Sequence, residues 1–363
     1  MDEQGAMDRA LECARQGWGR VHPNPLCGAV VLSEGVPVAE GYHAEFGGLH
    51  AERMALEKAE GRSRQSTLVV TLEPCTHEGK QPPCVPAIIQ AGVRRVVIAL
   101  RDPNPEAGGG VDLLRAAGLD VDVGLGAEQA AVDNAIFLHR HLDPSRPYVA
   151  LKLATTLDGR IADFSGRSRW ISGAEARAYV HWLRAGFDAI GVGGRTARMD
   201  DPSLTVRGAL EPRRPPARVV FDSRASLPGT LRIVTTAREI PTYCVASPLA
   251  DAGRRRGLEA AGVRVLVPDS LAAGLEALRA MGIGSLLVEG GGRLAAALLE
   301  ADLVDRFYWI QSPLWLGDSG TQAVGGLPGR KVGSADRWHV VDRRALDEDT
   351  LLVVDRKSCL PAS

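Results

Sequence analysis

The sequence predicts an α/β protein built from two domains, and three observations lead to this expectation. The chain has 363 residues, which is long for one domain. Apolar runs typical of strands alternate with stretches of helical spacing along most of the chain. A proline-containing segment, DPSRP at residues 143–147, separates two such series. We therefore expect one domain over residues 1–145 and a second over residues 146–363.

The first half is expected to begin with a helix over residues 7–15, because Ala10, Leu11 and Ala14 recur at helical spacing. Two short apolar runs separated by Ser33-Glu34-Gly35 then predict a hairpin. Helices and strands alternate from there, which predicts a layered domain whose later strands are parallel. The expected strands cover residues 26–32, 36–40, 67–72, 95–100 and 119–123, and the remaining helices cover residues 50–60, 85–91, 111–117 and 127–141.

The same alternation restarts after the proline-containing segment, with Lys152 inside the first strand of the second half. Its buried apolar runs predict one continued sheet, and two strands near the end are expected to add to it. The expected strands cover residues 148–153, 187–192, 217–221, 241–245, 263–267, 285–289, 303–311 and 350–355, with helices over residues 174–184, 271–281 and 293–300.

Composition excludes several classes of protein. There are 43 Lys and Arg residues against 44 Asp and Glu residues, so the formal charge is −1 and gives no overall attraction to nucleic acid. The N-terminus has no secretory signal pattern, and no run approaches the roughly 20 apolar residues that span a bilayer. Six cysteines in a chain of this length indicate reduced thiols. We expect a cytoplasmic protein without a membrane or nucleic-acid partner.

The stretch from residue 49 to residue 84 holds a candidate zinc site. It contains His50, Cys75 and Cys84, and one imidazole with two thiolates is a natural ligand set for zinc. Three protein ligands leave a fourth position open for water, as a catalytic site requires. Glu52 follows in the first turn of the expected helix, close enough to handle a proton. This order of residues is typical of zinc deaminases, although the gap between the two cysteines is eight residues and not two.

Other interpretations of these residues stay open. Cys75 and Cys84 could be ordinary buried thiols or a redox pair. His77 could supply a fourth ligand, which would close the site and make the zinc structural. The protein would then be a zinc-stabilised binding protein and not an enzyme.

The second half carries two glycine-rich strand ends, at residues 191–196 and 285–292. Glycines there allow a phosphate to approach the backbone, and a following helix offers free N–H groups to it. Neither cluster is a complete dinucleotide fingerprint, and each could be a tight turn. Arg184 and Arg207 are candidates for a substrate phosphate, and the alternative for each is a surface ion pair.

At this point the motifs resemble a known family, the bifunctional deaminase/reductases of riboflavin biosynthesis. The motifs HPNPLCGAVV, HAERMAL, TLEPCTHEGKQPPC and RDPNP resemble its deaminase half, and LKLATTLDGRIA, SRWISG, DDPSLTVR and LLVEGGGRLAAALLEADLVD resemble its reductase half. The resemblance covers almost the whole chain, in the family's order. It implies a cytidine-deaminase-like domain followed by a dihydrofolate-reductase-like domain, with Zn²⁺ and NADPH as cofactors.

The resemblance also implies roles for particular residues. His50, Cys75 and Cys84 would hold the zinc, and Glu52 would carry protons between water and the leaving ammonia. Lys152 would lie at the second reaction centre, although a lysine at a strand edge is the alternative. The NADPH contacts would be Ala154, Trp170, Thr196, Asp200, Ser223, Gly291, Gly292, Arg293 and Leu294, and the substrate contacts would be Ser168, Arg184, Leu204, Arg207 and Glu289.

The implied activity is two consecutive steps on a phosphorylated pyrimidine, a hydrolytic deamination and then reduction of the ribosyl side chain to ribityl. We expect a homo-oligomer, of a size that the sequence does not determine. A nucleic-acid deaminase with an unrelated C-terminal domain is the alternative enzyme, and the near-zero net charge counts against it.

Overall fold

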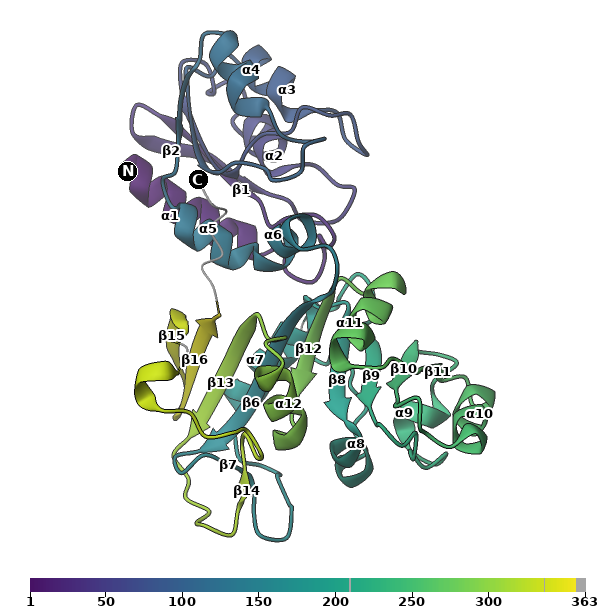
Figure 1. Ribbon diagram of the computed structural model, residues 1–363. Helices are drawn as coiled ribbons and strands as arrows, with labels where there is room; N and C mark the ends of the chain where they lie inside the picture. Colours follow the sequence, from purple (N-terminus) through teal and green to yellow (C-terminus); the bar gives the residue numbers. More distant parts are fainter. Residues whose placement is uncertain (209, 336, 357–363) are drawn as a thin grey trace. The chain divides into compact units, whose positions relative to one another are not determined.

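The computed structural model describes residues 1–208, 210–335 and 337–356. They form two compact units, one over Met1–Leu142 and one that begins at Asp143 (Figure 1). The division falls at the first residue of the proline-containing segment, where few apolar side chains are available to join the two series of elements.

The first unit is built on a five-stranded sheet with the strand order β2-β1-β3-β4-β5. Strand β1 is antiparallel to β2 and β3, whereas β3, β4 and β5 run parallel. The elements are α1 (Glu3–Arg15), β1 (Gly28–Ser33), β2 (Val36–Tyr42), α2 (Ala51–Lys58), β3 (Thr67–Leu72), α3 (Cys84–Gln90), β4 (Arg95–Leu100), α4 (Gly110–Ala116), β5 (Asp120–Val123), α5 (Ala127–Asp133) and α6 (Ala135–Leu142).

Helices cover both faces of this sheet, which explains why β1, β3 and β4 are continuous apolar runs. One core joins α2, α3 and α4 to the first face, and a second joins α1, α5 and α6 to the other (Figure 1). Successive strand residues serve alternate cores, as Val69 and Val70 do in β3. The loops at the carboxyl ends of β3 and β4 thereby gain a rigid support.

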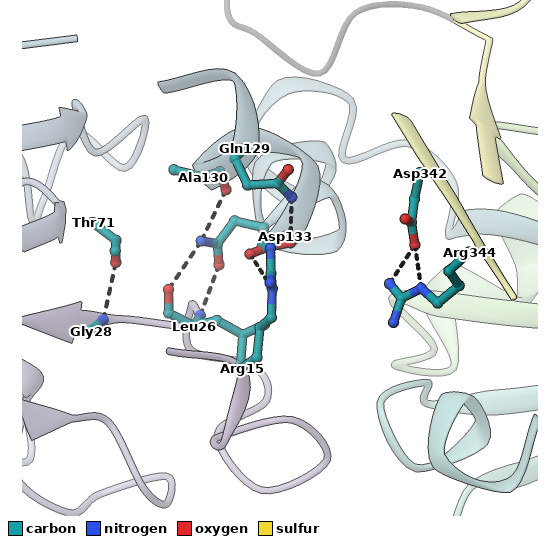
Figure 2. A network of polar contacts seen from close by, with 10 residues as sticks. Arg15, Leu26, Gly28, Thr71, Gln129, Ala130, Asp133, Asp342 and Arg344 are labelled. Carbon is teal, nitrogen blue, oxygen red and sulfur yellow. Dashed lines mark hydrogen bonds and ion pairs between the residues drawn. The ribbon is translucent and has the colours of Figure 1, made fainter. Parts of the chain in front are cut away.

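The helix expected over residues 127–141 is interrupted at Asn134, and that expectation was wrong in this respect. The Asn134 amide accepts from the Leu26 N–H at 2.8 Å and donates to the Leu26 and Ala130 carbonyl oxygens. Figure 2 shows Leu26 and Ala130, the two partners of this amide, beside the ion pair of Arg15 with Asp133. The helical bonds from the Asn134 N–H to Ala130 and from the Leu138 N–H to Asn134 remain, but the Asn134 backbone leaves the helical region at φ −103° and ψ 18°, which divides α5 from α6. The side chain that bonds to a distant segment accompanies this break.

The second unit is built on a nine-stranded sheet with the order β11-β10-β9-β8-β12-β6-β13-β16-β15. Neighbours from β11 to β13 are parallel, and β16 and β15 add antiparallel strands at one edge. The strands are β6 (Tyr148–Thr156), β8 (Ala189–Gly193), β9 (Ala217–Phe221), β10 (Thr242–Val245), β11 (Arg264–Leu266), β12 (Ser285–Glu289), β13 (Arg306–Ser312), β15 (His339–Leu346) and β16 (Asp349–Asp355), with a separate pair β7 (Arg160–Ala162) and β14 (Thr321–Gln322).

Helices again pack on both faces of the larger sheet. The core on one face contains α11 and α12, and the core on the other contains α8, α9 and α10. The helices are α7 (Ala174–Ala185), α8 (Gly194–Asp200), α9 (Arg232–Thr235), α10 (Ala252–Ala260), α11 (Leu271–Ala280) and α12 (Gly292–Glu300), and Val332–Ser334 forms the 3₁₀ turn η1. None of the helices in the described part of the chain is both long and apolar enough to cross a bilayer.

Candidate active sites

A group of three metal-capable side chains lies where α2 and α3 begin. His50 is the residue before the first turn of α2, Cys84 opens α3, and Cys75 follows β3 after a short loop. Each thiol sulfur lies 3.4 Å from the His50 Nδ1, and the three ligand atoms are all within 4.8 Å of one another. The topology therefore gathers at one point residues that are 34 positions apart in the sequence.

The chemistry of this donor set fits zinc. The Cys84 backbone N–H points at the Cys75 sulfur at 3.4 Å, and such a donor favours the thiolate. The Cys84 thiol and the His50 imidazole hold the pKa of the Cys75 thiol well below its ordinary value, against the opposing effect of burial. Two sulfurs and one imidazole nitrogen are ligands that zinc accepts at a tetrahedral centre, and they leave one position for water.

His77, the residue that could have closed the site, is exposed. Among the described residues the group of candidate ligands consists of His50, Cys75 and Cys84, without His77. The arrangement is therefore the open three-ligand kind that hydrolytic enzymes use, and the interpretation as a closed structural zinc loses its basis.

Glu52 lies in the first turn of α2 and is only 4% exposed. Burial raises the pKa of this carboxyl group, since a charged carboxylate loses hydration in such a place. A buried carboxyl with a raised pKa beside a metal site is the arrangement expected of a group that exchanges protons during a reaction.

Two polar residues that sequence reasoning missed hold this site in place. The buried Glu73 carboxylate accepts from the backbone N–H groups of Asp102 at 3.0 Å and Val111 at 2.9 Å, which ties the loop after β4 to the start of α4. The buried His43 lies 2.9 Å from the Leu49 carbonyl oxygen and packs edge-on to His50. The one available signal was a charged residue that directly follows a buried strand, as Glu73 does after β3.

The second unit contains a cleft of about 1620 Å³ at the carboxyl ends of β6, β8, β9 and β12. This is where open parallel sheets bind their ligands. The residues predicted to contact NADPH all line it, namely Ala154, Trp170, Thr196, Asp200, Ser223, Gly291, Gly292, Arg293 and Leu294. The predicted substrate contacts line the same cleft, namely Ser168, Arg184, Leu204, Arg207 and Glu289, and Lys152 lines it as well.

A largely buried charge cluster lines the cleft. Arg184 donates two hydrogen bonds to the Glu289 carboxylate, at 2.5 Å from Nε and 2.8 Å from Nη2. Burial would raise the pKa of Glu289, but the Arg184 guanidinium outweighs it and holds that pKa below its ordinary value. Lys152 lies opposite Glu289 in the β6–β12 register, and burial lowers the pKa of its amine. A lowered pKa makes this lysine a better proton donor than an exposed lysine.

The glycine-rich strand ends leave room for phosphates. Gly291 has a φ of 91°, and a Cβ on Gly292 would lie 2.5 Å from the Gln322 carbonyl oxygen, so neither position accepts a side chain without a shift. The first turn of α12 follows directly and exposes its N–H groups to the cleft. Basic side chains of Arg195 and Arg293 also line this region, and together these features fit the anionic groups of NADPH.

Asp222, at the end of β9, was also missed by sequence reasoning. Its carboxylate accepts from the Ser226 N–H at 2.7 Å and pairs with Arg198 of α8 at 3.1 Å. A Cβ on Gly194 would lie 2.8 Å from Asp222, so α8 begins close against this carboxylate. The available signal was the one that Glu73 also carries, a charged residue that directly follows a buried strand. Of its two partners, Ser226 is four residues further along the chain and Arg198 comes from α8.

Comparison with known proteins matches each unit to a family profile. Residues 1–100 match the cytidine and deoxycytidylate deaminase zinc-binding region. Residues 147–352 match the RibD C-terminal domain, a reductase domain of the dihydrofolate-reductase-like fold. The second match excludes the alternative of a nucleic-acid deaminase joined to an unrelated C-terminal domain.

Full-length relatives show the same organisation. The riboflavin biosynthesis protein RibD of Aquifex aeolicus is 38% identical over 357 residues, which are 98% of each chain. That of Escherichia coli is 39% identical and covers 97% of this chain and 99% of its own.

Solved structures agree with these sequence matches. Acinetobacter baumannii RibD superimposes with a TM-score of 0.82 at 34% identity, over 97% of this chain and 98% of its own. The Thermotoga maritima deaminase/reductase does so with a TM-score of 0.81 at 37% identity, over the same shares of the two chains. The chain therefore belongs to the RibD family of riboflavin biosynthesis proteins, and is a bifunctional enzyme with a zinc-binding deaminase domain and an NADPH-dependent reductase domain.

Proposed function

We propose that His50, Cys75 and Cys84 hold the zinc of the deaminase domain and that Glu52 is its proton carrier. The observation that carries this proposal is the three-ligand group with a buried carboxyl in the next helical turn. The Thermotoga maritima relative is named a diaminohydroxyphosphoribosylaminopyrimidine deaminase and 5-amino-6-(5-phosphoribosylamino)uracil reductase. We assign the same two consecutive reactions to this chain.

In the first reaction a water replaces the ring amino group of the pyrimidine. Zinc, when bound, supplies Lewis-acid activation of that water. The Glu52 carboxylate takes a proton from the water and returns one to the amino group, which leaves as ammonia. Burial of Glu52 suits both halves of this role, because a raised pKa makes the carboxylate a better proton acceptor than an exposed one.

In the second reaction, NADPH, when bound, supplies the hydride for C1′ of the ribosyl side chain. The ring-opened imine accepts it, and the imine nitrogen then needs one proton to become an amine. We assign this proton to Lys152, whose burial lowers the pKa of the amine. Arg184 and Arg207 are assigned to the substrate phosphate, for which guanidinium groups are suited donors. The position of these residues around one cleft supports the assignment.

The test is NADPH oxidation with the undeaminated pyrimidine as sole substrate, for the wild type and for Glu52→Gln. The wild type should oxidise NADPH, and the variant should lose this activity by about 10² to 10⁴, the usual value of general acid–base catalysis. Supplying the product of the first reaction, 5-amino-6-(5-phosphoribosylamino)uracil, should restore full NADPH oxidation to the variant. The zinc content of the variant should be unchanged. Normal ammonia release by Glu52→Gln would refute the role of Glu52, and wild-type protein that never oxidises NADPH would refute the second site.

We further propose a cytoplasmic homo-oligomer. None of the five described cysteines forms a disulfide bond, as a reducing compartment favours. Strand β15 ends the larger sheet and exposes most of its residues, and such an edge offers backbone groups for pairing with a second copy. Sedimentation equilibrium on the full chain decides the point, and a monomeric mass at micromolar concentration would contradict it.

A further inference from the structure

The segment of residues 201–207 joins α8 to the chain before β9 without any regular secondary structure. It carries Leu204 and Arg207, two of the residues assigned above to the substrate. Asp201 and Leu204 have φ values of 39° and 49°, a region that side chains disfavour. Sheet bonding does not fix this segment, so other contacts must determine where the Arg207 guanidinium lies.

Helix α7 supplies two of these contacts from one face. His181 and Arg184 are three positions apart, so both side chains project to the same side of the helix. The Arg207 backbone N–H donates to His181 Nδ1 at 3.1 Å, and Arg184 Nη1 donates to the Thr205 carbonyl oxygen at 2.8 Å. Arg184 also donates two hydrogen bonds to the Glu289 carboxylate, so two partners fix the position of its guanidinium group. His181 is thus the contact that acts on residue 207 itself.

We propose that His181 is a positioning residue of the reductase site, which holds Arg207 where it meets the phosphate of the substrate. The inference rests on the proposed function, because that assigns Arg207 to the phosphate. His181 lines the cleft together with Arg184 and Arg207. The Arg207 guanidinium makes no ion pair with any residue in the described ranges, so it is available to an anionic ligand.

The imidazole suits this role only in its neutral form, with Nδ1 as the acceptor and the proton on Nε2. The groups that face it are Arg184 and Arg207, which are cationic, the Glu289 carboxylate and the Thr205 carbonyl oxygen. Burial and the two arginines lower the pKa of His181, although Glu289 and Thr205 oppose them. The ring is therefore ready to accept the Arg207 N–H at neutral pH.

The test compares three variants of the full chain in steady-state NADPH oxidation with 5-amino-6-(5-phosphoribosylamino)uracil as substrate. His181→Leu keeps the bulk but removes the acceptor, whereas His181→Asn keeps an acceptor near the position of Nδ1. Arg207→Ala removes the phosphate contact itself. We expect His181→Leu to raise KM for the uracil about tenfold and to leave kcat and KM for NADPH within about twofold. His181→Asn should stay within about threefold of wild type.

A double variant and a control separate the possible failures. In the Arg207→Ala background, His181→Leu should add less than about twofold to KM, because the residue it positions is gone. Glu175→Leu, on the exposed first turn of α7, should leave both KM values unchanged. If Arg207→Ala leaves KM for the uracil unchanged, the assignment of Arg207 fails. If Arg207→Ala raises KM for the uracil but His181→Leu does not, the inference about His181 fails. It also fails if His181→Asn raises this KM as much as His181→Leu does.

Discussion

The charge cluster under the reductase cleft makes a quantitative prediction about Glu289→Gln. The substitution keeps the size of the side chain and one carbonyl oxygen but removes its negative charge. Arg184 and Glu289 are each 13% exposed at the side chain, and Lys152 lies opposite in the neighbouring strand. In the variant, the Arg184 guanidinium would keep its charge but would have lost its carboxylate partner.

Breaking a buried ion pair from one side costs about 3–5 kcal/mol, and the slight exposure here places the expected loss near about 3 kcal/mol. For a domain of this size, each kcal/mol shifts the melting temperature by about 2–4 °C, so the larger unit should melt about 6–12 °C lower. The pKa of Glu289 lies below its ordinary value of 4.5 in the folded protein. Its contribution is therefore complete above that ordinary value and is lost as the pH falls through the folded pKa.

The assay is differential scanning calorimetry of wild type, Glu289→Gln, Arg184→Gln and the double variant at pH 7 and near pH 4. At pH 7 the double variant should be less destabilised than the sum of the single variants, because it leaves no unpaired charge. The difference between wild type and Glu289→Gln should shrink at the lower pH. A shift below about 1 °C at pH 7, or strictly additive losses, would refute the reasoning.

Three further predictions concern other parts of the chain. Cys84→Ser should lower the zinc content measured by atomic absorption and abolish ammonia release. NADPH oxidation with 5-amino-6-(5-phosphoribosylamino)uracil as substrate should persist. Gly292→Ala places a Cβ 2.5 Å from a backbone oxygen and should weaken NADPH binding about tenfold in a fluorescence titration. Gly229→Ala is the matched control, because the Cβ added at this position would meet no neighbouring atom within 4 Å. Asn134→Ala leaves the Leu26 backbone unpaired and should cost the smaller unit about 2–3 kcal/mol in urea unfolding, without any change in NADPH affinity.

Local sequence patterns predicted the group of candidate metal ligands because its members lie close together in the chain. His50, Glu52, Cys75 and Cys84 fall within one short stretch, and a strand followed by helix starts places their side chains at one end of a sheet. The expected helix there began one residue early, since His50 precedes the first turn of α2. This difference leaves the ligand set unaffected.

Elements without an apolar pattern escaped prediction. Helix α10 contains three consecutive arginines and buries only Leu258, so it shows no stripe of helical spacing. Strand β15 lies at an edge and carries Asp342, Arg343 and Arg344; Figure 2 shows the first and last of these in contact. Helix α8 follows a glycine-rich strand end and is only seven residues long. Solvent faces most of α10 and β15, which removes the periodicity that prediction needs, whereas α8 is too short to show it.

The reductase site depends on the order in which strands lie in the sheet, which no local pattern encodes. Strand β12 lies between β6 and β8, although it follows both in the chain by about a hundred residues. This insertion brings Glu289 opposite Lys152 on one side and Val288 opposite Gly191 on the other. The charge cluster and the glycine-rich cradle therefore form only when β12 completes the sheet. Each strand contributes a fragment of the site, and the parallel register is what aligns those fragments at one edge.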